Sequence, residues 1–319
     1  MVLTNNVHLS IKTNRLLYDT LIKINYLCGV SKTMENIKLI LIGGAEDKTN
    51  KLEVLSKVAE AARFKNIVLI PTASNYPHEA ELNYKDAFDK LHVENFKSLD
   101  IRYPDECDRA EYIEAVKQAH LIFFSGGDQV KLVDTLKGSI LLETILSLYR
   151  SNKVVVAGTS AGAAAASENM LYNGDYHGFI KGEVKNSLGF GFVNDMVIDT
   201  HFLNRERIPR LLQMLALGVE KRAIGLDEDT AIFIDTNNNF EVVGSGMVTL
   251  LNSEEMTYND FHEIKENQTY NINNVKIGFL SRGAKFNLVS WMVIKPQTAV
   301  INDNTHTYEH PFIIPGAYI

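Results

Sequence analysis

Short, wholly apolar runs recur along the first half of the chain, and segments with helical spacing separate them. Residues 39–42, 67–70, 121–124 and 154–157 are each too short for a helix and predict buried strands. Between the first two runs, the apolar residues from Leu52 to Ala62 recur at spacings of three and four, which predicts a helix. Apolar strands that alternate with helices are typical of a parallel sheet covered on both faces. This half of the chain therefore predicts an α/β fold with three layers.

Small residues follow four of these strands directly. They are Gly43-Gly44, Thr72-Ala73-Ser74, Gly126-Gly127 and Ser160. In open parallel sheets, sites gather beyond the carboxyl ends of the strands. We therefore expect these four places to lie along one rim of a mostly parallel central sheet.

The pattern changes after residue 171. Residues 172–194 are rich in glycine and irregular, and a helix is predicted from about Glu206 to Leu217 because Pro209 is tolerated only in a first turn. Residues 241–293 alternate with a period of two, which predicts a β-rich C-terminal part. We expect an N-terminal extension (1–33), one α/β domain (34–298) and a C-terminal tail (299–319), with Met34 as a possible true start.

Composition narrows the classes of function. The 319 residues are 45% hydrophobic and 22% charged, as in ordinary globular proteins, and the net charge of −7 argues against nucleic-acid binding. Two isolated cysteines, Cys28 and Cys107, predict neither a disulfide framework nor a zinc site. No apolar run reaches the ~18 residues of a membrane span, and the N-terminus lacks a signal-peptide pattern. An enzyme of the cytoplasm is the expectation.

The stretch from Val154 to Ala166 carries the strongest candidate for chemistry. Gly158-Thr159-Ser160-Ala161-Gly162 follows a predicted strand and precedes an alanine-rich segment that favours a helix. This is the setting that the G-x-S-x-G nucleophile elbow requires. Such a turn holds its serine in a strained conformation with the hydroxyl accessible. We predict Ser160 as the nucleophile; the alternatives are a chance match and a glycine-rich turn that binds phosphate.

A serine hydroxyl becomes an effective nucleophile only when a base takes its proton, and histidine is the usual base near neutral pH. Among nine histidines, His201 follows a predicted strand and precedes a helix, where a loop can direct it to the rim. His177, in the glycine-rich segment, is its nearest competitor. The alternative for His201 is a residue that only packs or caps near a helix start.

The base needs an acidic partner that sets its tautomer and stabilises the imidazolium. Asp227, Glu228 and Asp229 stand between two apolar segments, so one tight turn offers three candidates, although a plain acidic turn is more common. For the oxyanion we predict the backbone N–H groups of Ala161, at the elbow, and Gly127, on a neighbouring strand end. Glycine suits that position because it lets the backbone approach a substrate closely.

Three arginines follow the candidate base. Arg207 and Arg210 are three residues apart and share a helix face, whereas the direction of Arg205 is open. Arginine is the side chain best suited to bidentate recognition of carboxylates. The cluster therefore predicts an anchor for an acidic group, and the alternative is a solvated basic face.

Six stretches within about residues 37–235 share their order and spacing with one known family. They are Gly43-Gly44-Ala45-Glu46-Asp47, Ile70-Pro71-Thr72-Ala73-Ser74, Phe124-Ser125-Gly126-Gly127-Asp128-Gln129, Gly158-Thr159-Ser160-Ala161-Gly162-Ala163, Asp199-Thr200-His201-Phe202 with the three arginines, and Gly225-Leu226-Asp227-Glu228-Asp229-Thr230-Ala231. The chain resembles the cyanophycinases, in the serine peptidase family that also includes aspartyl dipeptidase (peptidase E).

The resemblance implies a glutaminase-like α/β fold and a triad of Ser160, His201 and Glu228. It also implies an intracellular enzyme, often a homodimer, that needs no metal. Its substrate would be cyanophycin, a poly-aspartate with arginine joined to each side-chain carboxyl, cut from one end into β-Asp-Arg dipeptides. Gln129 and the three arginines match positions that grip this substrate, and we add Asp199 and Thr200 to the predicted substrate-binding residues.

One departure concerns specificity. Cyanophycinases commonly have Asp-Gln-His-Phe where this chain has Asp199-Thr200-His201-Phe202, so a hydroxyl replaces an amide that touches the substrate. An aspartyl dipeptidase, or a hydrolase of β-aspartyl peptides, is therefore the second hypothesis. A third, of another class, is a non-catalytic ligand-binding module on a glutaminase-like scaffold.

Overall fold

The computed structural model describes residues 36–174 and 178–295. The predicted extension 1–33, the tail 299–319 and His177 lie outside the described residues, so the predicted domain boundaries stay predictions. No helix in the described part of the chain is long and apolar enough to cross a membrane.

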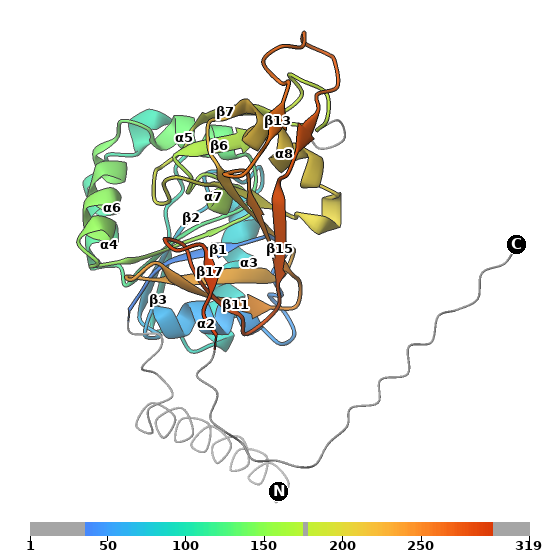
Figure 1. Cartoon of the computed structure of the whole chain (residues 1–319). Helices are drawn as coiled ribbons and strands as arrows, with labels where there is room; N and C mark the ends of the chain where they lie inside the picture. Colours follow the sequence, from blue (N-terminus) through green and yellow to red (C-terminus); the bar gives the residue numbers. More distant parts are fainter. Residues whose placement is uncertain (1–35, 175–177, 296–319) are drawn as a thin grey trace, which may run out of the picture.

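The large sheet has nine strands among the described residues, in the order β17-β16-β11-β10-β1-β5-β4-β2-β3 (Figure 1). In chain order they are β1 (Ile37–Ile42), β2 (Asn66–Ile70), β3 (Asn95–Ser98), β4 (Leu121–Phe124), β5 (Val155–Thr159), β10 (Thr230–Asp235), β11 (Asn239–Gly244), β16 (Lys285–Asn287) and β17 (Met292–Val293). The pairings among β1, β5, β4, β2 and β3 are parallel. Those that add β10, β11, β16 and β17 are antiparallel. The α/β fold is confirmed, and its sheet is half parallel and half antiparallel.

Helices cover both faces of the parallel half. They are α2 (Glu53–Ala61), α3 (Pro77–Lys90), α4 (Ala110–Gln118), α5 (Gln129–Leu136), α6 (Ile140–Arg150) and the short α7 (Ala161–Ala164). Because successive strand residues point to opposite faces, Leu39 and Leu41 pack with α4, α5 and α6. Ile40 and Ile42 pack with α2 and α3. Both faces need apolar side chains, which explains why the run is continuous rather than alternating.

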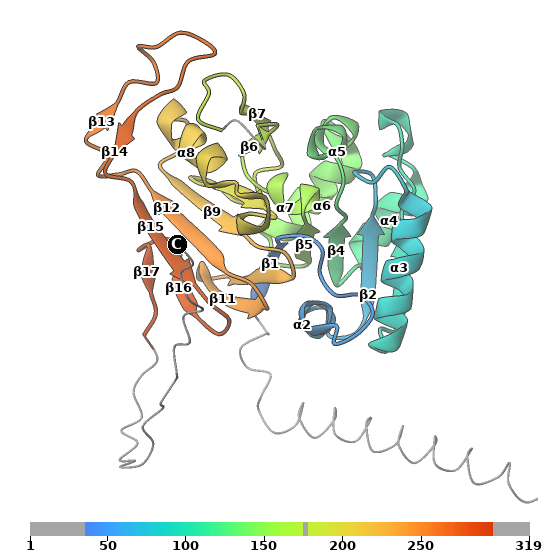
Figure 2. The same cartoon turned by 90° about the vertical axis from the view of Figure 1, so that its right-hand side faces the viewer.

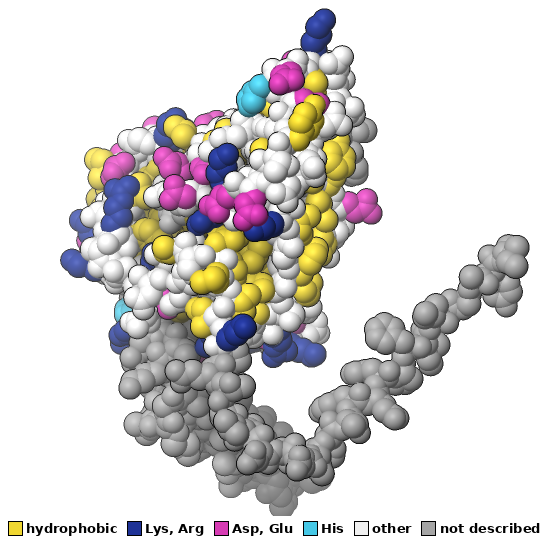
Figure 3. All heavy atoms as spheres, viewed as in Figure 1, with side chains coloured by type: hydrophobic (Ala, Val, Ile, Leu, Met, Phe, Trp, Pro, Cys, Tyr) yellow, Lys and Arg dark blue, Asp and Glu magenta, His cyan; other side chains and the backbone are white. Residues whose placement is uncertain are grey.

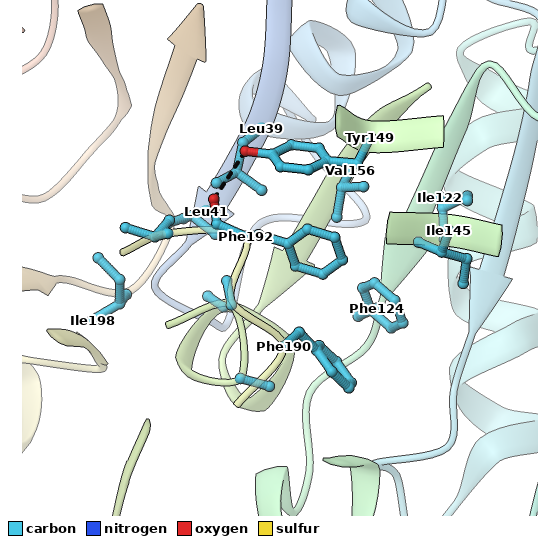
Figure 4. Packing of buried hydrophobic residues seen from close by; sticks show 14 of the residues in the cluster. Leu39, Leu41, Ile122, Phe124, Ile145, Tyr149, Val156, Phe190, Phe192 and Ile198 are labelled. Carbon is cyan, nitrogen blue, oxygen red and sulfur yellow. Dashed lines mark hydrogen bonds between the residues drawn. The ribbon is translucent and has the colours of Figure 1, made fainter. Parts of the chain in front are cut away.

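The core on the α6 face is rich in aromatic rings, as Figure 4 shows. Phe124 and Phe190 lie with ring centroids 5.3 Å apart, and Tyr149 meets Phe192 edge to face at 4.9 Å. The Tyr149 hydroxyl donates a hydrogen bond of 2.9 Å to the Phe192 carbonyl (dashed in Figure 4). The glycine-rich segment that contains Phe190 and Phe192 is thereby fastened to the sheet.

A second sheet of four strands lies beside the antiparallel strands of the first (Figures 1 and 2). Its strands are β8 (Val197–Thr200), β9 (Arg222–Leu226), β12 (Val248–Asn252) and β15 (Lys276–Leu280), and helix α8 (Ile208–Leu217) packs on it. Two short hairpins pair β6 (Asn169–Tyr172) with β7 (Lys185–Leu188), and β13 (Tyr258–Asn259) with β14 (Ile272–Asn273). The predicted β-rich C-terminal part is confirmed.

Two local predictions differ from the structure. Helix α8 begins at Ile208, because Glu206 has a left-handed φ of 54° and ends the 3-10 turn Leu203–Arg205. The segment 172–194, predicted to be irregular, contains β7. Residues 185–188 have no buried side chain, so no apolar alternation marks the strand.

Candidate active site

The elbow at Ser160 joins β5 to α7, and its glycines are required by close contacts. Ser160 has φ 50° and ψ −110°, a conformation that L-residues rarely adopt. A Cβ on Gly158 would lie 2.4 Å from the Gly162 carbonyl oxygen, and one on Gly162 would lie 2.5 Å from that of Phe124. The two glycines of the motif thus let the helix start approach the strands closely while Ser160 turns outward.

His201 reaches this serine from the small sheet, directly after β8. Its backbone N–H donates to the Gly43 carbonyl over 2.8 Å, and its Nε2 lies 2.8 Å from Ser160 Oγ. A Cβ on Gly44, which has φ +100°, would lie only 2.4 Å from the imidazole. The glycine pair after β1 therefore provides a backbone anchor and the space for the ring.

The acidic turn separates into one residue that faces the imidazole and two that hold the backbone. Glu228 Oε1 lies 2.8 Å from His201 Nδ1. Asp227 accepts hydrogen bonds from the backbone N–H groups of Leu203 and Met247, at 2.8 and 3.0 Å. Asp229 accepts from Asp47 N–H at 3.0 Å and from a serine hydroxyl. Of the three candidates, the structure brings Glu228 to the base.

The tautomer of His201 follows from these neighbours. A carboxylate can only accept, so Nδ1 carries the proton toward Glu228 and Nε2 is left to accept from the Ser160 hydroxyl. Burial lowers the pKa of His201 below its ordinary 6.5, and the charges of Arg205 and Arg207 act in the same direction. The hydrogen bond to Glu228 opposes them. The ring is thus held neutral, as a base must be.

The two predicted oxyanion donors border the same cavity as Ser160. Ala161 is the first residue of α7, so its N–H has no partner within that helix. Gly127 has φ +141°, and a Cβ there would lie 2.1 Å from the Ala73 carbonyl oxygen. The next glycine back, Gly126, packs its Cα against Ser160, with a Cβ position 3.2 Å from the serine Cβ. Glycine at 126 lets this loop lie against the elbow, and glycine at 127 lets it lie against the backbone of Ala73.

A cavity of about 310 Å³ beside the serine contains most of the predicted substrate-binding residues. Its walls include Gln129, Thr200, Arg205, Arg207 and Arg210. The Gln129 amide is oriented by donating to the Leu171 carbonyl at 3.1 Å. Arg205 is exposed, whereas Arg207 and Arg210 are only 6% and 3% exposed. The arginines thus form a wall in which only Arg205 is solvated.

Asp199, which was predicted to bind substrate, lies under that wall and does not line the cavity. Its side chain is fully buried, with Arg207 Nη1 3.4 Å and Arg210 Nε 3.2 Å from its carboxylate oxygens. Arg207 also donates to the Thr200 carbonyl at 2.7 Å. A buried carboxylate between two buried guanidiniums orients them and offsets part of their charge. Sequence alone could not separate this supporting role from direct contact.

Glu46 is a site residue that the sequence reasoning did not single out. It is 3% exposed; Oε2 accepts from Thr159 Oγ1 at 2.6 Å, and Oε1 accepts from the Tyr84 hydroxyl and from Lys48 Nζ at 2.9 Å. Thr159 immediately precedes Ser160, so this carboxylate supports the elbow from beneath. The available signal was an acidic residue directly after the strand-end glycines, on the predicted rim.

Two other features lie apart from this chemistry. A larger cavity, of about 860 Å³, opens near the start of β1 between Lys38, Arg150 and Asp195, and it holds none of the predicted site residues. Among the described residues, no group of three or more His, Cys, Asp and Glu side chains is arranged to hold a metal ion.

Comparisons with known proteins agree with the motifs. The model of the family described as peptidase family S51 matches residues 39–242. A cyanophycinase of Geminocystis herdmanii is 31% identical over 257 residues, which cover 78% of this chain and 93% of that protein. One from Trichormus variabilis is 30% identical over 264 residues, or 80% and 87% of the two chains.

A solved structure supports the fold. The crystal structure of a peptidase from an acI-B1 Actinobacterium superposes with a TM-score of 0.61 at 24% identity, covering 80% of this chain and 98% of that one. At this identity the likeness concerns the architecture.

Proposed function

The chain belongs to peptidase family S51 and is a serine peptidase, and on that premise we propose that it is an exopeptidase that degrades cyanophycin (multi-L-arginyl-poly-L-aspartate) to β-Asp-Arg dipeptides. Ser160, His201 and Glu228 form its catalytic triad. The observation that carries the proposal is the pair of 2.8 Å contacts that link these three side chains. Family membership also argues against the third hypothesis, a non-catalytic binding module.

The reaction proceeds by acyl transfer to the serine. Ser160 Oγ attacks the scissile carbonyl carbon while His201 Nε2 takes its proton, and the resulting imidazolium returns the proton to the leaving amine. In the second step, His201 takes a proton from the water that attacks the acyl-enzyme, and the Ser160 oxygen regains this proton as the acid product leaves. Glu228, 2.8 Å from Nδ1, stabilises the imidazolium that forms in both steps.

The backbone N–H groups of Gly127 and Ala161 stabilise the tetrahedral intermediates. Negative charge develops on the former carbonyl oxygen, and donors that are already oriented cost no reorganisation at that moment. The loop at Gly127 contacts the elbow, and Ala161 begins a helix whose N-terminus favours negative charge. Removal of one such donor typically costs about 10²–10³ in kcat.

The arginine wall recognises the carboxylates of the substrate. Each arginine of cyanophycin keeps a free α-carboxylate, so the polymer presents an anion at every residue. Arg205 meets it from solvent, and Asp199 holds Arg207 and Arg210 in place behind it. Gln129 adds an amide to the same wall. The planar guanidinium of arginine can donate two parallel hydrogen bonds to one carboxylate.

A hydrolase of aspartyl or β-aspartyl dipeptides is the second candidate, and Thr200 is the residue that favours it. Thr200 lines the arginine cavity where cyanophycinases commonly carry glutamine. A shorter side chain with one hydroxyl offers fewer hydrogen bonds to a long substrate. The triad chemistry would be unchanged, and only the length of the bound peptide would differ.

Incubation with purified cyanophycin and, separately, with Asp-Xaa and β-Asp-Xaa dipeptides tests both candidates. We expect β-Asp-Arg from the polymer, identified by mass spectrometry, and no product from the Ser160→Ala variant, whose circular dichroism should match that of the wild type. Cleavage of the dipeptides alone would select the second candidate. Full activity of Ser160→Ala would remove Ser160 from the mechanism.

The homodimer and the cytoplasmic location implied by the resemblance are part of this proposal. Exposed apolar side chains on β15 and β17 support the dimer: Ile277 and Phe279 are 44% and 52% exposed, and Met292 is 63% exposed. Figure 3 shows hydrophobic side chains gathered over these strands. Light scattering of the purified protein would give twice the chain mass, 35.8 kDa each, if the proposal holds.

A further inference from the structure

Ser160 and His201 border two cavities at once. The arginine cavity, of about 310 Å³, lies on one side, and a second cavity of about 350 Å³ lies on the other. Among the described residues, these two are the only ones that line both. A substrate whose carbonyl carbon meets Ser160 therefore extends one part into each cavity.

One face of helix α3 forms the outer wall of the second cavity. Tyr76, Glu79 and Asn83 line it, and their spacing of three and four residues places them on the same side of the helix. Glu46 and Lys48, from the segment after β1, also line the cavity, as does the ring of Tyr84 from α3. These segments are separate from those that carry the arginines.

The second cavity has an excess of negative charge. Lys48 Nζ lies 2.9 Å from Glu46 Oε1 and 5.0 Å from the centre of the Tyr84 ring, so its charge is compensated within the wall. Glu79 is exposed, and its carboxylate has no hydrogen bond or ion pair with any described residue. Two carboxylates and one ammonium leave one uncompensated negative charge, on Glu79, opposite the arginine wall.

An aromatic face accompanies this carboxylate. Tyr76 is 73% exposed and stands immediately before α3, while Glu79 lies in the first turn of that helix. A guanidinium is planar and weakly hydrated, stacks on aromatic rings and donates to carboxylates. The two side chains together match those properties.

We infer that the second cavity binds a guanidinium group of the substrate, with Glu79 as its carboxylate partner and Tyr76 as its stacking face. This inference rests on the proposed function, because the guanidinium is that of an arginine in the cyanophycin chain. The serine then lies between an anion-binding wall and a cation-binding wall. A substrate that carries both charges around the scissile bond is bound from both sides.

Matched substrates isolate the guanidinium. Short oligomers of β-Asp-Arg are compared with oligomers of β-Asp-citrulline, in which a neutral urea of nearly the same shape replaces the guanidinium. The wild type, Glu79→Gln and Glu81→Gln are assayed for kcat/KM on both. Glu81 is the control, since it is on the same helix, pairs weakly with His78 at 3.9 Å and does not line the cavity.

We expect Glu79→Gln to lower kcat/KM on the arginine oligomer by about tenfold, as for loss of a hydrogen bond to a charged group. The kcat/KM of Glu79→Gln on the citrulline oligomer should equal that of the wild type. The kcat/KM of Glu81→Gln should equal that of the wild type on both oligomers. An equal loss on both oligomers, or no loss on either, would overturn the inference.

Binding to the Ser160→Ala variant, measured by titration calorimetry, separates this inference from the proposed function. If the wild type hydrolyses neither oligomer, the proposed function fails, and the calorimetry still decides the second cavity. Tighter binding of β-Asp-Arg than of β-Asp-citrulline, lost when Glu79→Gln is added, supports the guanidinium site. Equal binding of the two oligomers, or no binding of either, refutes it.

Discussion

Replacing Gly44 with alanine tests whether the backbone after β1 positions the imidazole of His201. In the wild type, His201 Nε2 lies 2.8 Å from Ser160 Oγ. A Cβ on residue 44 would lie 2.4 Å from the imidazole Cε1 and Nε2, whereas ordinary contacts begin at 3.4 Å. Since the Cβ is fixed to the backbone, the imidazole ring must move by the difference between these two distances, about 1 Å.

A displacement of that size is larger than the hydrogen bond tolerates. If the Ser160–His201 contact lengthens by about 1 Å, it passes the ~3.2 Å limit of a good hydrogen bond. Misplacement by about 1 Å can cost on the order of 100-fold in rate, or ~2.7 kcal/mol at ~1.36 kcal/mol per tenfold. Alanine at φ +100° adds about 1–2 kcal/mol of backbone strain to the folded state.

The assay is the rate at which a fluorophosphonate probe labels Ser160, because it reports activation of the serine without requiring the natural substrate. Gly138→Ala is the control: it has φ +77°, and its Cβ would have no neighbour within 4 Å, so it carries the strain without the clash. Gly44→Ala should lose at least as much thermal stability as Gly138→Ala, and only Gly44→Ala should label about 100-fold more slowly. Equal labelling rates of the two folded variants would refute the reasoning.

Three further results are expected. Glu228→Gln should reduce kcat much more than Asp227→Asn. Asp227→Asn should mainly lower the unfolding temperature, because Asp227 accepts hydrogen bonds from two backbone N–H groups. Steady-state kinetics and thermal melts measure both effects, and the reverse result would mean that the two roles are exchanged. The acid limb of the kcat/KM profile should lie below pH 6.5, since burial lowers the pKa of His201. Arg205→Gln should move this limb to higher pH, because it removes a positive charge that also lowers the pKa of His201. A shift of the limb to lower pH would contradict this role of Arg205. Asp199→Asn should lower the unfolding free energy by about 3–5 kcal/mol in urea titrations, because two buried guanidiniums each lose one counter-charge, and an unchanged midpoint would exclude that role.

The sequence predicts those parts of the molecule that depend on local pattern. Apolar runs such as 39–42 must be buried on both faces, and the strand–turn–helix around Ser160 follows from its small residues. Because His201 follows a strand, the sequence also indicated that its side chain is directed to the rim of the sheet. Each of these depends on neighbouring residues and on the rule that parallel strands end at one rim.

The remaining features depend on contacts between distant segments. Nothing local distinguishes Glu228 from Asp227, because both are acidic residues of one turn. That turn connects β9 in the small sheet with β10 in the large sheet, and this path directs Glu228 to the imidazole. The burial of Asp199 and the closeness of Gly44 to His201 also result from packing of the small sheet against the end of β1. A single sequence does not encode such distances in its periodicity.

The separate origin of the two cavity walls has a consequence for how such enzymes diversify. One wall comes from residues 45–84 with the loop at 125–126, and the other from residues 128–130, 172–173, 200 and 205–210. Mutations accumulating in either group can alter what is accepted on that side of the cleaved bond without touching Ser160 or the ring beside it. Gene libraries randomised in one group alone should thus yield altered selectivity with turnover intact, making this scaffold a tractable start for peptidases of new preference.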